Sequence, residues 1–94
     1  PNAATDFLAE MRRVLKVGGV LGVIEHAGHP AYDYGALHRA LESQVVADAQ
    51  NAGLFVEASG KNLRNIEDNR SGSIFAEGMR GATDRFVLRI IKKR

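Results

Sequence analysis

The chain has 94 residues, of which 45% are hydrophobic, so it can form at most one domain, with a small core. The formal net charge is only +2, and the basic residues are scattered apart from a solvated tail at Lys92, Lys93 and Arg94, so we expect no nucleic-acid partner. The absence of cysteine excludes disulfides and thiolate metal sites, and the lack of a signal peptide or of an apolar run of membrane length favours a cytoplasmic protein with no membrane partner.

The first predicted element is an amphipathic helix. Its apolar residues recur at helical spacing and form one stripe: Phe7, Leu8, Met11, Val14 and Leu15. Asn2 or Thr5 can cap the helix, because either side chain accepts a hydrogen bond from a free backbone amide. We expect the helix to end near Lys16, where Gly18 and Gly19 stop it by adopting a left-handed conformation without a Cβ clash.

The sequence predicts the first strand from Val20 to His26. The apolar run in this segment shows almost no polar alternation, which is typical of a strand covered on both faces of a parallel α/β sheet. Glu25 and His26 are its first polar side chains, and they stand at the carboxyl end, where open α/β sheets bind ligands. The segment AGHPAYDYG that follows is rich in Gly, Pro and Tyr and predicts a loop.

The helical period returns at Ala36. The stripe Leu37, Leu41, Val45, Ala49 and Ala52 predicts one helix from about Ala36 to Ala52, bent near Ser43. Alternatively, Ser43 caps a shorter helix and the preceding residues form an irregular lead-in. Gly53 ends this helix, and Leu54 to Ala58 predicts the second strand.

The segment from Lys61 to Ala82 has no sustained period, and a stretch of this length is often functional or mobile. Short helical turns around Leu63–Glu67 or Ile74–Met79 are compatible with the sequence. Arg85 to Ile91 then alternates, with Phe86, Leu88 and Ile90 on one side, and predicts a third strand that is partly solvated on its other face.

Two sequence patterns resemble class I S-adenosylmethionine-dependent methyltransferases. The first is RVLKVGG followed by an apolar strand and an acid; the family reads R-V-L-K-P-G-G, so Val17 departs from it at the proline position. The second runs from LHRALESQVVADAQNAGLFVEASGKNLRN to GATDRFVLRIIKK. A bacterial subgroup is especially similar, because it has an aspartate-histidine pair after the strand (here Glu25-His26), a later L-H-R (here Leu37 to Arg39) and a closing T-D-R-F-V-L (here Thr83 to Leu88).

The resemblance covers nearly all of residues 1–94 but only the second half of the family's domain. It implies a single, incomplete domain with a partial Rossmann-like methyltransferase fold in the order helix-strand-helix-strand-strand. We expect three layers, a small mixed sheet, and an antiparallel closing hairpin between the second and third strands. The family's glycine-rich turn after the first strand and the acid after the second are absent, since the sequence has no G-x-G-x-G. We therefore expect no cofactor for this chain alone, and S-adenosylmethionine only if another polypeptide supplies the missing half.

The candidate catalytic residues are Glu25, His26 and His38. A histidine at a strand tip has a suitable intrinsic pKa for proton transfer, and the resemblance implies that His26 and His38 line the substrate side of the cleft. Candidate substrate-binding residues are His29, Tyr32, Tyr34 and Arg39, and the tyrosines can either stack on a flat substrate or simply cover an apolar edge.

Other residues allow a functional or a purely structural interpretation. Asp68, Asp84 and Arg85 can be site residues or can form a turn and an ion pair. His26, His29 and Glu25 contain metal-ligating groups, but the two histidines lie in a loop and lack the i, i+4 spacing of a helical metal site, so we predict no metal.

Three classes of function remain open on the sequence alone. The chain is the substrate-side half of a methyltransferase that is inactive by itself, a non-catalytic self-associating remnant, or a small-ligand or metal-binding module. The substrate is an unidentified small molecule in the first case. We expect a homodimer or higher oligomer through the apolar edge of Val20–Ile24, because unpaired backbone groups on such an edge favour pairing with another chain.

Overall fold

A computed structural model describes residues 3–76, 78–79 and 81–94 of the chain. The elements are α1 (Ala3–Val14), β1 (Val20–His26), α2 (Glu42–Asn51), β2 (Phe55–Gly60) and β3 (Arg85–Ile91). This order confirms the small α/β arrangement that the sequence predicts. β1 and β3 have the predicted bounds, whereas β2 begins one residue later and ends two residues later than expected.

The three strands form one sheet in the order β1-β3-β2, and β3 is antiparallel to both neighbours. Val20 lies opposite Ile91 and His26 opposite Arg85, while β2 pairs from Phe55 opposite Ile91 and contains an irregularity between Val56 and Ala58. The predicted antiparallel pairing of β2 with β3 is confirmed. The predicted mixed sheet is wrong, because β3 lies between β1 and β2 and so no two parallel strands are neighbours.

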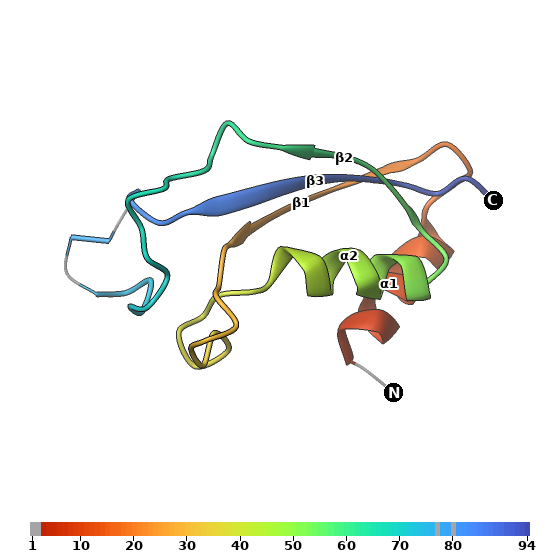
Figure 1. Cartoon of the computed structure of the whole chain (residues 1–94). Helices are drawn as coiled ribbons and strands as arrows, with labels where there is room; N and C mark the ends of the chain where they lie inside the picture. The colour runs from red at the N-terminus through yellow and green to blue at the C-terminus, as the bar shows by residue number, and fades with distance from the viewer. Residues whose placement is uncertain (1–2, 77, 80) are drawn as a thin grey trace.

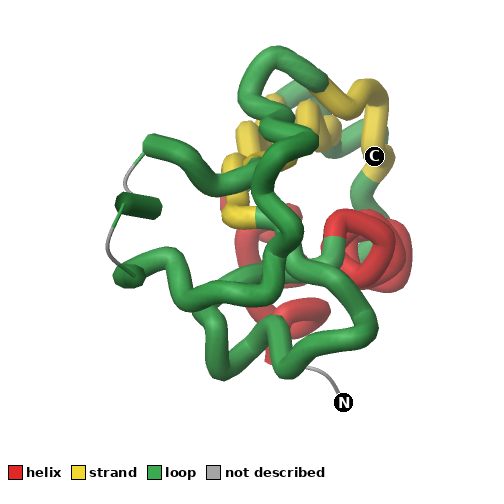
Figure 2. The backbone as a smooth tube through the Cα atoms, turned by 60° about the vertical axis from the view of Figure 1, so that its left-hand side comes forward, coloured by secondary structure: helices red, strands yellow, loops and turns green. Residues whose placement is uncertain are grey.

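Both helices cover the same face of the sheet (Figures 1 and 2). The buried apolar residues come from the helices and from one face of β3: Leu8, Ala27, Ala49, Leu54, Phe86, Leu88 and Ile90. The fold therefore has two layers and not the predicted three. The alternation along β3 explains this result, since one face is entirely apolar while the other carries Arg85 and Arg89 and stays open.

β1 is an edge strand with one uncovered face. Leu21 and Val23 pack against the core, but Val20 is 43% exposed and Ile24 is 59% exposed, so the expectation of a strand covered on both faces is wrong. The stripe of α1 is also only partly covered: Leu8 is buried, whereas Phe7 and Val14 are exposed. This part of the chain thus has more apolar residues than the two layers bury.

The predicted turn between α1 and β1 is confirmed by Gly18, whose φ of 85° lies in the left-handed region. Its amide donates to the Lys92 carbonyl at 2.7 Å and so ties the turn to the end of β3. Thr5 lies inside α1 and its hydroxyl donates to Asp48, so it is not the helix cap. Asn2 lies outside the described residues.

α2 begins at Glu42, so the predicted long helix from Ala36 is wrong. The alternative of a shorter helix is closer, although Ser43 lies within its first turn and the cap position is Leu41. The residues before it bind the end of β1: Ala40 donates to the His26 carbonyl at 2.9 Å and accepts from Gly28 at 2.7 Å. These hydrogen bonds, with His38 at φ 59°, are incompatible with a continuous helix.

The segment between β2 and β3 contains turns, and its described residues form none of the short helices that the sequence allows. Among the described residues, neither helix is long and apolar enough to cross a membrane.

Candidate functional site

The candidate site lies at the carboxyl end of β1, where the loop 27–41 and the long segment 61–84 meet. Ala27 and Ala40 form an isolated parallel bridge there. Gly28 permits the close return of the loop, because a Cβ at this position would lie only 2.6 Å from the Cβ of Tyr34. The loop is thus folded back onto the strand end, and it places His38 and Arg39 beside it.

Arg39 is the centre of a buried polar cluster. Its Nη1 donates to the Ala27 carbonyl and to Asp68, at 2.9 and 2.7 Å, and its Nε donates to the Gly72 carbonyl at 2.9 Å. The side chains of Arg39 and Asp68 are 0% and 2% exposed. The guanidinium therefore fastens both loops to the strand end, and this geometry favours a structural role over the predicted contact with substrate.

The carboxylate of Asp68 is buried, which opposes its ionisation. The hydrogen bonds from Arg39 and from the backbone amides of Asp84 and Arg70, together with attraction to the Arg39 charge, outweigh that burial. The pKa of Asp68 consequently lies below its ordinary value. The Arg39–Asp68 pair remains charged at neutral pH.

Asp84 forms a second, adjoining ion cluster. Its Oδ2 lies 2.8 Å from Nη2 of Arg64 and 3.1 Å from Nε of Arg70, and its Oδ1 accepts from the Asn65 amide. Arg64 also lies 3.6 Å from Glu42. Across both clusters three guanidinium groups face three carboxylates, so their charges balance. The clusters therefore do not form an anion-binding site, and they provide the ion-pair role that the sequence left open for Asp68 and Asp84.

His26 is the functional candidate with the most suitable surroundings. Its Nδ1 lies 2.7 Å from the hydroxyl of Thr83, a buried residue just before β3. Its ring lines a hollow of about 530 Å³ together with Ile74, Phe75 and Met79. Nε2 forms no hydrogen bond with the described residues, so the ring is oriented by Thr83 while its second nitrogen remains available to a ligand.

His38 lies near the same hollow without lining it. Its ring is 5.0 Å from that of Phe75 in an edge-to-face contact, and Phe75 lines the hollow. The backbone of Ile74 donates to the Leu37 carbonyl at 3.4 Å, so the two segments run side by side. His26, at the end of β1, and His38, in the loop that follows, therefore border the same segment, which their separation of 12 residues in the sequence does not reveal.

The other predicted residues lie elsewhere. Glu25 lines a groove on the helix side of β1, and adjacent residues of a strand point to opposite faces, so Glu25 and His26 do not converge. His29 accepts a hydrogen bond from the Ala31 amide and contacts the ring of Tyr32 at 5.7 Å, in the exposed tip of the loop. Tyr34 is half-buried over Gly28.

The geometry gives no support to a metal centre. In the part of the chain that the structure describes, no three His, Asp or Glu side chains are grouped closely enough to hold an ion. The separation of Glu25, His26 and His29 explains this result for the group that the sequence singled out.

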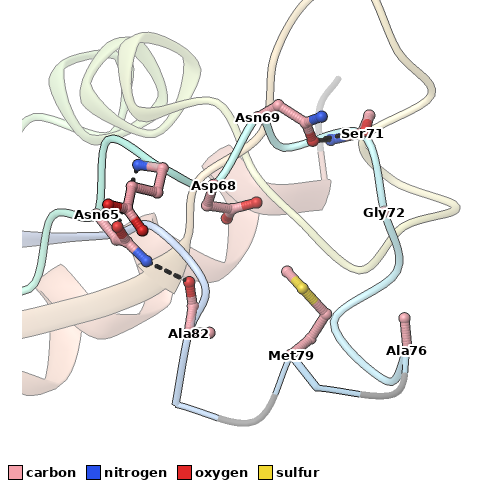
Figure 3. A pocket seen from close by; sticks show the side chains of 9 residues that line it. Asn65, Asp68, Asn69, Ser71, Gly72, Ala76, Met79 and Ala82 are labelled. Atoms are coloured by element: carbon pink, nitrogen blue, oxygen red, sulfur yellow. Dashed lines mark hydrogen bonds between the residues drawn. The ribbon is translucent and has the colours of Figure 1, made fainter.

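Figure 3 shows a second hollow, of about 380 Å³. It adjoins the first, because Ala76 and Met79 line both. It is bordered by Asn65, Asp68 and Met79, but Asn65 donates to the Ala82 carbonyl at 2.7 Å and Asp68 is paired with Arg39. Because its buried polar groups already have partners, this hollow is a weaker candidate than the one beside His26.

Thr83 and Phe75 are the contributors that the site prediction omitted. Thr83 belongs to the T-D-R-F-V-L pattern that the resemblance singles out, so a signal was present. Phe75 lies in a segment without periodicity, and no sequence pattern connects it with His38.

Comparisons with protein-family models, with curated proteins and with solved structures find no match to this chain.

Proposed function

We propose that this chain is the substrate-side half of a methyltransferase-type domain, which binds a methyl acceptor in the hollow beside His26 and takes no part in holding the methyl donor. The sequence patterns around Gly18, Glu25-His26 and Thr83 motivate this proposal. The observation that carries it is the position of His26: a histidine at a strand's carboxyl end, oriented by a buried hydroxyl and bordering an open hollow.

The hollow fits an acceptor that is flat, largely apolar and bears one hydroxyl or amine. Ile74, Phe75 and Met79 provide apolar contacts, and Nε2 of His26 is the polar group available among them. In its neutral form an imidazole nitrogen can accept a proton from such an acceptor, which would make the acceptor more nucleophilic. The residues present do not fit S-adenosylmethionine itself, because no glycine-rich turn follows a strand in this sequence.

Phenol is a suitable probe of this site, and NMR of the whole chain is a suitable measurement. Millimolar phenol should shift the ring resonances of His26, His38 and Phe75 and leave those of the exposed His29 in place. His26→Ala should abolish the shifts at Phe75, whereas the matched change His29→Ala should preserve them. S-adenosylmethionine alone should produce no calorimetric signal.

The proposal would be contradicted by equal shifts at His29, by unchanged shifts in His26→Ala, or by micromolar binding of S-adenosylmethionine to the chain alone. A non-catalytic, self-associating protein is the second candidate function, and the free edge of β1 is the observation that favours it.

A further inference from the structure

The edge of β1 that faces away from β3 carries unpaired backbone groups over a limited length. The Ala27 amide, just after β1, donates to the Asp84 carbonyl, just before β3. Every second residue of β1, counted back from Ala27, therefore directs its amide and carbonyl toward β3. The amides and carbonyls of Val20, Gly22 and Ile24 therefore face the free edge, and so does the carbonyl of His26. Since Ala40 already binds His26, the available edge spans only Val20 to Ile24, and its midpoint is Gly22.

We propose that a second copy of this chain pairs with that edge, antiparallel and about a two-fold axis at Gly22, to form one continuous six-stranded sheet. In this register Gly22 lies opposite Gly22 of the second copy, and Val20 lies opposite Ile24. Each of these residues directs its backbone groups to the partner, which gives about six hydrogen bonds between the strands.

Side-chain faces and an occupied backbone carbonyl disfavour registers shifted by one residue, or by two residues toward the carboxyl end. Registers shifted by one residue would place the helix face of one strand beside the open face of the other. A shift by two residues toward the carboxyl end would place Leu21 opposite Glu25 and would require the His26 carbonyl, which is already bonded. With the axis at Gly22, Leu21 meets Val23 on the helix face and extends the core.

The ends of the edge meet the turn that precedes β1 of the second copy in the same register. Glu25 lies opposite Gly19 of the second copy, and the Gly19 amide donates to the Lys16 carbonyl within one turn at 2.8 Å. Glu25 and Lys16 are both exposed. The two-fold axis therefore places each Glu25 beside the turn of the other chain that contains Lys16.

The exposed area also suits one interface of ordinary size. Monomeric proteins with the mass of this chain, 10.2 kDa, expose about 5,300 Å² by the usual scaling, whereas this chain exposes 6115 Å². The excess is about 800 Å², close to what each partner loses in a standard interface. Nine large hydrophobic side chains are exposed among the described residues, and five of them belong to α1, β1 or the turn between them: Phe7, Val14, Val17, Val20 and Ile24.

Light scattering on the intact chain at about 100 µM tests the state of association, and two pairs of variants test the register. Gly22→Pro should give a folded monomer, because its amide faces the free edge, whereas Val23→Pro removes an amide directed toward β3 and should unfold the chain. Ile24→Lys, at an exposed position on the edge, should also weaken association without altering the circular dichroism.

Cysteine substitution gives a direct test of the axis, because the natural chain contains no cysteine. Gly22→Cys should oxidise to a covalent dimer, since opposed hydrogen-bonded residues lie about 5.5 Å apart between Cα atoms. Val20→Cys should not, because its counterpart lies four positions away. A monomer at this concentration would overturn the proposal, as would a dimer that survives both Gly22→Pro and Ile24→Lys or that crosslinks equally through Val20→Cys. This edge is separate from the hollow beside His26, so either proposal can fail without the other.

Discussion

At the scale of single residues, the buried Arg39–Asp68 pair organises the end of the molecule that carries the candidate site. Arg39 contacts the carbonyls of Ala27 and Gly72 in addition to Asp68, so it joins the end of β1 to the segment between β2 and β3. Removing one partner of such a pair would leave an uncompensated buried charge. We therefore expect the site geometry to depend on this pair even though it touches no substrate.

Acid should weaken the fold through Asp68. Its pKa is lower in the folded chain than in the unfolded chain, so the unfolded chain binds the proton first and stability falls as pH decreases. The contribution of Asp68 is complete above the ordinary aspartate pKa, about 4, and is lost as pH falls through the depressed value. Urea unfolding at fixed protein concentration between neutral and acid pH measures this loss.

Two variants make this prediction specific. Asp68→Asn should lose about 3–5 kcal/mol at pH 7 and should then show a smaller further loss in acid. Glu42→Gln, which removes a partly exposed carboxylate from the Arg64 pair, should change stability by about 0–1 kcal/mol. If Asp68→Asn does not fold, the Asp68 pKa can be measured by NMR in the natural chain, and a value at or above the ordinary one would contradict the prediction.

At the scale of elements, the turn between α1 and β1 depends on Gly18. A Cβ at Gly18 meets no atom within 4 Å, so a substitution there tests backbone conformation alone. Gly18→Ala should destabilise the fold by about 1–2 kcal/mol, because alanine is strained at a φ of 85°. Thermal and urea unfolding would measure the change.

Gly35→Ala is the matched control for this turn. Its φ is not in the left-handed region and its Cβ would come no closer than 3.9 Å to Asp33, so we expect no loss, or a gain of up to about 1 kcal/mol from a less flexible unfolded chain. Equal destabilisation by both substitutions would show that the left-handed conformation of Gly18 is not what the turn requires.

At the scale of the whole molecule, the two-layer arrangement covers one face of β3 with helices and leaves the other face open. Ile90 is fully buried beneath the helices, whereas its neighbour Ile91 is half-buried on the open face. Ile90→Ala should therefore lose about 2–5 kcal/mol and Ile91→Ala roughly half of that or less, in unfolding experiments at equal protein concentration. Similar losses at both positions would indicate that a further layer covers the open face.

The proposed function and the proposed dimer both involve the free edge of β1. In a complete methyltransferase domain, as the resemblance implies, the edge of β1 would pair with a strand from the missing half. The same edge cannot bind a second copy at the same time. A donor-side polypeptide would therefore have to displace the second copy, and excess donor-side polypeptide should shift the light-scattering mass from the homodimer to a heterodimer.

The sequence by itself determined those elements in which local pattern and burial agree. The alternation of Phe86, Leu88 and Ile90 identified β3 and its buried face, and the apolar run with Gly18 before it and His26 at its end gave the bounds of β1. Gly53, with a φ of 84°, ended α2 as predicted. Each of these signals depends on residues that are neighbours in the chain.

Tertiary structure decided the rest. The insertion of β3 between β1 and β2 left β1 at an edge, and its apolar run, which is typical of a strand covered on both faces, lies half uncovered. The residues before α2 do not begin a helix at Ala36, because Ala40 instead forms a hydrogen bond with His26. His38 contacts Phe75, which belongs to a segment without a periodic sequence pattern. Such contacts join residues far apart in the sequence and form only when the whole chain has folded, so no local pattern predicts them. Their free energy outweighs the local preference for helix.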